Sequence, residues 1–198
     1  MRQGNRAVLQ RRSMTKDMAV CGLFAALTAV GAFMKIVIPA GADTMNFTLQ
    51  WFFVLLAGLL LGSKRAFMSV ATYLIIGLIG IPVFARGGGP AYLLRPTFGF
   101  LLGFALAAYA MGKVCELMHS ARTKTWIAAA AVGYVIYYGM GMLYFYFISH
   151  VVVPKPVGWG AIFTIYCLPT MIPDILLCGV AIMVAARLRP VVVHMLES

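Results

Sequence analysis

Long apolar segments alternate with short polar segments along most of this chain. The apolar segments cover residues 18–38, 47–62, 66–84, 97–112, 126–148 and 161–187. Each is close to the length of about 20 residues that an α-helix needs to cross the hydrocarbon core of a membrane. The pattern therefore predicts an all-α membrane protein with six transmembrane helices in one domain.

Helix-breaking and polar residues set the expected boundaries in the first part of the chain. The first helix should begin near Asp17 and end before Pro39. The second helix should run from Phe47 to Gly62. Between them, we expect residues 39–46 to form a short external link.

A glycine-rich loop is expected after the third helix, which should end near Gly80. The loop covers residues 85–96, and its three consecutive glycines permit positive φ angles. Pro96 is then expected as the first residue of the fourth helix, where its missing N–H costs nothing. The whole chain divides into a basic tail, a helical domain and a short C-terminal tail: 1–16, 17–190 and 191–198. We expect the basic tail to be disordered or to lie at the membrane interface.

The composition excludes an ordinary soluble domain. The chain of 198 residues is 63% hydrophobic and 11% charged, whereas about a quarter of the residues of a soluble domain are charged. The net charge of +11 raises the alternative of a nucleic-acid partner.

The placement of the positive charges argues against nucleic acid. In a six-helix topology, twelve basic residues fall on one side of the membrane: Arg2, Arg6, Arg11, Arg12, Lys16, Lys64, Arg65, Lys113, Arg122, Lys124, Arg187 and Arg189. The other four fall on the opposite side: Lys35, Arg86, Arg95 and Lys155. Because basic residues concentrate on the cytoplasmic side of membrane proteins, both termini should be cytoplasmic. Topology thus explains the basicity.

Asp174 is the acidic residue that lies within a long apolar segment. A carboxylate at membrane depth costs on the order of 2.5 kcal/mol or more unless it faces a partner or a cavity. Pro169 and Pro173 flank it and should open the helix there. Asp174 is therefore a candidate ligand-binding residue that accepts N–H donors, or one that binds a proton.

Arg86 and Arg95 are candidate ligand-binding residues in the glycine-rich loop. An arginine at the membrane interface can also extend toward lipid headgroups. We favour a ligand role for Arg95, since its guanidinium can pair with a carboxylate through two hydrogen bonds. An arginine at the mouth of a pocket and a carboxylate deeper inside suit an elongated small molecule with an acid at one end.

Other polar and small residues extend the candidate site. Asn46 and Gln50 are four residues apart, on one helical face, and either bind ligand or simply close the helix end. Thr170 lies one turn before Asp174. The spacing of small residues in the first helix allows close helix approach, either within the chain or with a separate membrane subunit.

No enzymatic motif is present. The sequence contains neither H-E-x-x-H nor G-x-S-x-G, and the glycine-rich loop lacks the G-K-[ST] ending of a phosphate-binding loop. The histidines do not cluster as metal ligands, and the four cysteines show no C-x-x-C spacing. We therefore expect no catalytic activity, cofactor or metal, and any transport driven by ATP would need other chains.

Several stretches resemble the BioY family, the biotin-binding S components of energy-coupling factor (ECF) transporters. The stretches are Thr48–Gln50, Val54–Arg65, Gly80–Phe84, Gly87–Leu94 and Pro96–Phe104. The most specific of them is the Pro-Thr-x-Gly-Phe pattern, and the resemblance covers residues 18–187. The family often has a lysine three residues after the aspartate, where this chain has Leu177.

The resemblance implies a six-helix S-component fold in the plasma membrane of a prokaryote. It implies biotin as ligand, together with a transmembrane T component and a pair of ABC-type ATPases as partners. The family's small-residue pattern selects Ala25 and Ala29 as contacts to the T component. On this basis the biotin carboxylate should meet Arg95, helped by Arg86, and the ureido ring should reach Asp174. Phe84, Tyr92 and Trp51 should cover the bicyclic body.

Three alternatives to biotin capture remain open. The chain could be an S component for another vitamin such as thiamin, although the two arginines argue against a cationic substrate. It could act alone as a proton-coupled carrier that uses Asp174. It could also be an intramembrane enzyme acting on a lipid, with Asp174 as general base.

Overall fold

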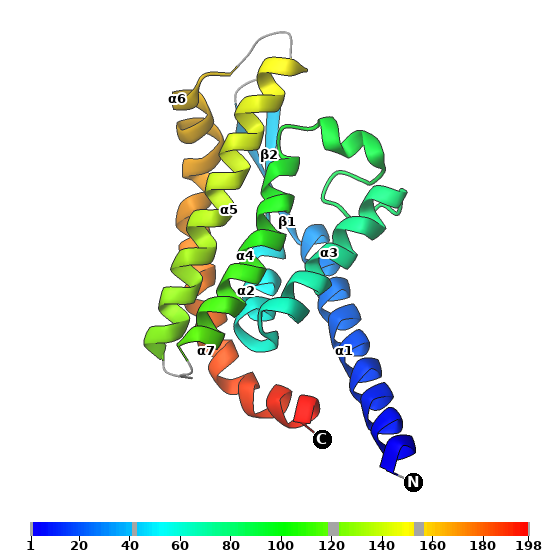
Figure 1. Ribbon diagram of the computed structural model, residues 1–198. Helices are drawn as coiled ribbons and strands as arrows, with labels where there is room; N and C mark the ends of the chain where they lie inside the picture. The colour runs from blue at the N-terminus through cyan, green and yellow to red at the C-terminus, as the bar shows by residue number, and fades with distance from the viewer. Residues whose placement is uncertain (1, 41–42, 119–122, 153–156, 198) are drawn as a thin grey trace.

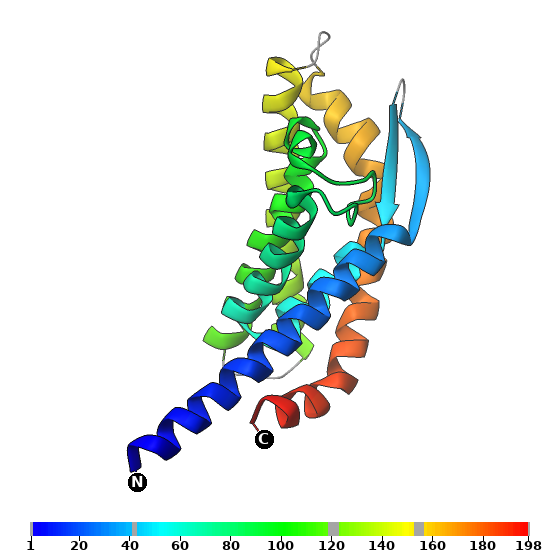
Figure 2. The same ribbon diagram turned by 90° about the vertical axis from the view of Figure 1, so that its right-hand side faces the viewer.

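A computed structural model describes the secondary structure of residues 2–40, 43–118, 123–152 and 157–197. Long helices run side by side in an elongated bundle, and a two-stranded antiparallel hairpin lies alongside the half of the bundle away from the termini (Figures 1 and 2). The first elements are α1 (Arg2–Phe33), β1 (Lys35–Ala40), β2 (Asp43–Thr48), α2 (Gln50–Leu61) and α3 (Ser63–Ile79). The remaining elements are η1 (Pro90–Leu94), α4 (Phe98–Leu117), α5 (Thr123–Val151), α6 (Trp159–Ala161), η2 (Ile162–Cys167) and α7 (Leu168–Glu197).

Four helical segments in the described part of the chain are long and apolar enough to cross a membrane. They are Met14–Phe33, Phe98–Leu117, Thr123–Val151 and Trp159–Val192. Many large apolar side chains on these helices are exposed, for example Val135 at 70% and Leu176 at 68%. Such surfaces are stable against lipid rather than water. The prediction of a mostly helical membrane protein is confirmed.

Helix α4 packs against α2, α3 and α5 and occupies the centre of the bundle. Two glycines allow this close packing. A Cβ atom on Gly112 would lie 2.3 Å from the backbone nitrogen of Ser63, and one on Gly103 would lie 2.8 Å from the carbonyl oxygen of Tyr137. Any larger side chain at either position would push a neighbouring backbone away.

The hairpin replaces a helix end and a link that the sequence pattern predicted. Helix α1 ends at Phe33 rather than shortly before Pro39, and α2 begins at Gln50. Residues 36–38 are all β-branched, which favours an extended backbone. Pro39 also restricts the residue before it to extended conformations. These local preferences for a strand outweigh the apolar pattern, which had predicted that the helix would continue to residue 38.

Other boundaries also differ from those expected. The basic tail, predicted to be disordered or interfacial, is helical from Arg2 onward as part of α1. Helix α4 begins at Phe98 instead of Pro96, while Pro90 begins the short helix η1. The expected end of α3 near Gly80 is confirmed, and the φ of +120° there suits glycine. Arg122 and Lys155, which belong to the predicted charge pattern, lie outside the described residues.

The helix around Asp174 stays continuous, although two prolines flank that residue. Pro173 lies inside α7, and the wider π-helical stretch η2 comes immediately before α7. Pro169 has no N–H and therefore cannot make the regular helical hydrogen bond. The wider π-helical turn just before it accommodates the missing bond. The prolines therefore change the helix locally without opening it.

Candidate ligand-binding site

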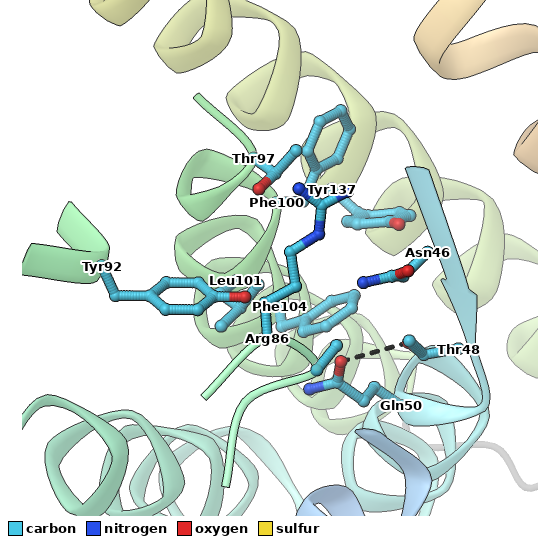
Figure 3. A pocket seen from close by; sticks show the side chains of 11 residues that line it. Asn46, Thr48, Gln50, Arg86, Tyr92, Thr97, Phe100, Leu101, Phe104 and Tyr137 are labelled. Atoms are coloured by element: carbon cyan, nitrogen blue, oxygen red, sulfur yellow. Dashed lines mark hydrogen bonds between the residues drawn. The ribbon is translucent and has the colours of Figure 1, made fainter. Parts of the chain in front are cut away.

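Two adjoining cavities lie among the hairpin, the loop after α3, and helices α2, α4, α5 and α7. The outer cavity has a volume of about 60 Å³. It is lined by Asn46, Thr48, Gln50, Ala85, Arg86, Tyr92, Thr97, Phe100, Leu101, Phe104 and Tyr137 (Figure 3). The inner cavity is lined by Asn46, Phe47, Thr48, Trp51, Phe104, Tyr137, Thr170 and Asp174. Because four residues line both cavities, the two form the outer and inner ends of one site.

A tight turn carries Arg86 into the outer cavity. The backbones of Phe84 and Gly87 exchange two hydrogen bonds of 2.9 and 3.1 Å, which leaves Ala85 and Arg86 at the tip. Figure 3 shows the Arg86 side chain extending across the middle of the pocket, with the Tyr92 hydroxyl and the Asn46 amide directed inward from opposite sides. The turn therefore presents a guanidinium group to any ligand that enters.

Phe84 anchors this turn from below and lines neither cavity in the described part of the chain. Its ring is 1% exposed and contacts the rings of Tyr73, Tyr92 and Phe98. The ring also occupies the space above Gly77, where an added Cβ would lie 2.1 Å from it. The expectation that Phe84 covers a ligand therefore differs from its observed place beneath the loop.

A chain of hydrogen bonds fixes the base of the same loop to the hairpin. The Thr48 hydroxyl donates to the Gln50 side chain (3.1 Å), whose amide nitrogen donates to the Tyr73 hydroxyl (2.6 Å). Tyr73 in turn donates to the carbonyl oxygen of Val83 (3.2 Å). Gln50, which is 2% exposed, thus holds the hairpin and the loop in register as well as lining the cavity.

Three nearly parallel aromatic rings form the wall between the outer and inner cavities. Trp51 stacks on Tyr137 at 4.6 Å between ring centroids, and Phe104 stacks on Tyr137 at 4.9 Å. The Trp51 and Phe104 rings are 5.9 Å apart. Such a wall offers flat apolar faces to a ring system.

The inner cavity ends at the buried carboxylate of Asp174, which is 2% exposed. The Tyr138 hydroxyl donates to Oδ2 of Asp174 at 2.6 Å and lies 3.0 Å from the hydroxyl of Thr170. The indole nitrogen of Trp51 is also buried, and in the described part of the chain its only nearby acceptor is the weakly accepting thiol of Cys178. The inner end therefore combines a hydrogen-bond acceptor with a hydrogen-bond donor that lacks a strong acceptor, as a polar ligand group requires.

Arg95 lies outside both cavities. Its side chain is exposed, and its guanidinium sits 5.3 Å from the centre of the Tyr92 ring in a cation–π contact. Burial raises the pKa of the Tyr92 phenol, while the charges of Arg95 and Arg86 oppose that rise. The Tyr92 hydroxyl thus stays protonated near neutral pH and can donate a hydrogen bond into the outer cavity.

The structure brings together most of the expected site residues. Those that line the two cavities are Asn46, Gln50, Trp51, Arg86, Tyr92, Thr170 and Asp174. The site also includes Phe100, Phe104 and Tyr137, which were not expected. Phe100 and Phe104 are one helical turn apart, a spacing that indicates a shared face but does not separate a pocket from ordinary packing.

The small residues of α1 differ in how far they are exposed. Ala25 is 5% exposed and belongs to the core, while Ala29 is half-buried against it. Gly22 and Ala26 are exposed, and a Cβ on Gly22 would meet no neighbouring atom within 4 Å. The exposed small residues in this part of α1 are Ala19, Gly22 and Ala26.

No group of three or more His, Cys, Asp or Glu side chains within the described residues could hold a metal ion. The free thiols of Cys21, Cys115, Cys167 and Cys178 are buried or partly buried. The polar chemistry of the site therefore rests on arginine, carboxylate, amide and hydroxyl groups.

Comparisons with known proteins support a relation to one transporter family. A sequence model of the BioY family matches residues 4–194. The probable biotin transporter BioY of Lysinibacillus sphaericus is 39% identical over 181 residues, covering 91% of this chain and 90% of that protein. The biotin transporter BioY of Thermotoga maritima is 35% identical over 175 residues, covering 88% of this chain and 96% of that protein.

A solved structure shares the same fold. The crystal structure of the S-component for biotin from an ECF-type ABC transporter matches with a TM-score of 0.74 and 22% sequence identity. The match covers 90% of this chain and 93% of that chain. The arrangement of helices described above is therefore the fold of that solved protein.

Proposed function

The chain belongs to the BioY family, and we propose that it is the biotin-capture subunit of an ECF-type vitamin uptake transporter. It is a multi-pass membrane protein, and membership of a transporter family implies binding and transport rather than catalysis. The resemblance of the sequence motifs to this family is thereby confirmed.

The observation that carries the proposal is the order of chemical groups along the site. A guanidinium lies at the outer end, aromatic faces lie in the middle, and a carboxylate lies at the inner end. Biotin has the matching order of a carboxylate, an apolar chain and bicycle, and a ureido group. A ligand with a cationic or acid-free outer end would offer this guanidinium no group of opposite charge.

Arg86 is the proposed partner of the biotin carboxylate, with the Tyr92 hydroxyl as a second donor. Each charge-assisted hydrogen bond contributes about 1.5–3 kcal/mol. Arg95 acts on this end indirectly, through its contact with the Tyr92 ring.

The ureido ring is proposed to lie in the inner cavity. Its N–H groups donate to Asp174, and its carbonyl oxygen accepts from the indole N–H of Trp51 or from the Asn46 amide. Thr170 completes the polar lining, and the bicycle rests against Phe104 and Tyr137. Every polar atom of the ureido group then has a partner, as buried polar groups require.

Biotin is larger than the 60 Å³ of the outer cavity. Entry therefore requires the Arg86 turn and the hairpin to separate, and the Tyr137 ring to shift so that the two cavities merge.

The proposed topology has six membrane spans, with α2 and α3 as the spans added to the four long helical segments. Both termini lie at the same end of the bundle, opposite the hairpin (Figure 1). The distribution of basic residues favours the cytoplasm for that end, in the plasma membrane of a prokaryote. The site then opens to the outside, as capture of a nutrient requires.

The proposed partners are a transmembrane T component and two ABC-type ATPases. The chain has no phosphate-binding motif of its own, so the energy for release into the cell must come from other subunits. Gly22 and Ala26 form the exposed small-residue face of α1 on which a T-component helix can pack closely.

Equilibrium binding to the purified, detergent-solubilised chain tests the proposal. Biotin should bind with high affinity, whereas thiamin at the same concentrations should not, because it brings a positive charge to Arg86. Tight binding of thiamin without binding of biotin would instead indicate an S component for another vitamin. Biotin uptake in cells that follows the proton gradient and survives ATP depletion would instead favour a carrier that uses Asp174.

A further inference from the structure

Lys35 connects the hairpin to the loop that carries Arg86. It is the first residue of β1 and pairs directly with Thr48 of β2. Residues paired across two strands place their side chains on the same face, and Thr48 lines both cavities. Lys35 therefore lies on the face of the hairpin that meets the ligand site.

The Lys35 ammonium donates a hydrogen bond of 2.6 Å to the carbonyl oxygen of Ala85. Ala85 and Arg86 form the tip of the tight turn. This contact joins segments that are 50 residues apart in the chain. Charge-assisted hydrogen bonds are roughly twice as strong as neutral ones, so a single bond can influence the position of a small turn.

The base and the tip of the loop are fixed in different ways. Phe84 and the bond from Tyr73 to Val83 hold the base in the protein core. The tip lies over the outer cavity and meets the hairpin through Lys35. Separation of the turn and the hairpin, which entry of a ligand requires, must therefore break the bond between Lys35 and Ala85.

We propose that Lys35 is a positioning residue that holds the Arg86 turn against the hairpin and thereby slows the departure of bound ligand. It acts through the backbone of Ala85 and does not contact the ligand. This inference rests on the proposed biotin-binding function for its main readout.

The main test measures how fast radiolabelled biotin leaves the full-length purified chain after an excess of unlabelled biotin is added. Lys35→Met keeps the length of the side chain but removes the donor, and dissociation should become about tenfold faster. Lys35→Arg should restore slow dissociation because it retains a charged donor. Lys124→Met, an exposed lysine at the start of α5, is the matched control and should leave the rate unchanged.

A second ligand separates positioning from direct contact. Biotinamide carries a neutral amide in place of the carboxylate. Lys35→Met should speed the release of biotin and biotinamide by the same factor, because the lysine bonds the protein backbone. If Lys35→Met speeds the release of biotin but not of biotinamide, Lys35 pairs with the ligand carboxylate, and the proposal is overturned.

Hydrogen–deuterium exchange without ligand tests the bond independently of biotin. Exchange in peptides covering residues 81–89 should be faster in Lys35→Met than in the native chain, and Lys35→Arg should reverse the change. Equal exchange in folded Lys35→Met and native protein would refute the inference. Failure of the native chain to bind biotin would instead refute the proposed function. The exchange measurement would then still show whether Lys35 holds the turn against the hairpin.

Discussion

Asp174 shows how a costly residue is tolerated within an apolar helix. Its carboxylate is buried, accepts a short hydrogen bond from Tyr138 and faces a small cavity beside the Trp51 indole. A buried charged group needs several hydrogen-bond partners to offset the loss of hydration. The N–H groups of the proposed ureido ligand would add further hydrogen bonds to this carboxylate.

The Asp174→Asn substitution tests this role at nearly constant shape. The amide nitrogen of Asn would face the ureido N–H groups, and the remaining oxygen carries no charge, so biotin affinity should fall about tenfold or more. Thermal unfolding should occur at the same or a higher temperature, because no buried carboxylate remains to be desolvated. Titration calorimetry and a melting curve check both parts. Undiminished affinity would place the ureido group elsewhere.

Sequence reasoning identified Asp174, Asn46 and Gln50 because polar residues in apolar surroundings stand out. It favoured Arg95 over Arg86 as the ligand-binding arginine of the glycine-rich loop, whereas Arg86 is the one that lines the cavity. Their difference arises from the hydrogen-bonded turn, which directs Arg86 inward while Arg95 stays exposed over Tyr92. The direction of a loop side chain depends on contacts that sequence spacing does not contain.

Among the elements, the loop after α3 depends on one aromatic anchor. Phe84 fills the space above Gly77, so the turn above it has a fixed place relative to α3. The three consecutive glycines made a loop predictable. The anchor was not predictable, because the fit between a ring and a helical glycine is a tertiary contact.

The Gly77→Ala substitution should displace that anchor. The new methyl group would overlap the Phe84 ring, and overpacking of this kind costs about 1–3 kcal/mol of stability. Because the Arg86 turn rests on Phe84, biotin affinity should fall as well. Gly139→Ala in α5 is the matched control, since no neighbouring atom lies within 4 Å of its added Cβ. Equal affinity in both variants would mean that the turn does not depend on Phe84.

The hairpin is the element that the hydrophobic pattern missed. Residues 36–38 extend an apolar run that also fits the end of a helix, and only their β-branching and the following proline favour a strand. The consequence for the site is direct, because β2 carries Asn46 and Thr48 into the cavities. Asn46 was expected near the site, but as part of the link before a helix, and Thr48 was not among the expected site residues.

On the scale of the whole molecule, the two ends of the bundle have different tasks. The hairpin lies in one half of the bundle, and both termini lie at the opposite end (Figures 1 and 2). The Arg86 turn and the candidate site adjoin the hairpin. Alternating polar and apolar segments predicted the helices well, because membrane thickness imposes their length. The exposed face of α1 was not predictable, since spacing alone does not tell which small residues point inward.

The Ala26→Leu substitution tests the proposed partner face. A larger side chain at this exposed position should leave biotin binding by the isolated chain unchanged, because it is remote from both cavities. It should prevent co-purification with the T component, since small residues are what allow close helix approach. Ala131→Leu on the exposed face of α5 is the control. Normal assembly of the Ala26→Leu chain would remove α1 from the proposed interface.

The most direct measurement compares biotin and biotinamide binding to native, Arg86→Gln and Arg95→Gln chains. If Arg86 pairs with the ligand carboxylate, Arg86→Gln should weaken biotin binding about tenfold or more. The same substitution should barely change the binding of the neutral amide, and Arg95→Gln should affect both ligands little. Equal weakening of both ligands by Arg86→Gln, or a loss specific to biotin in Arg95→Gln, would contradict the proposed orientation of biotin in the site.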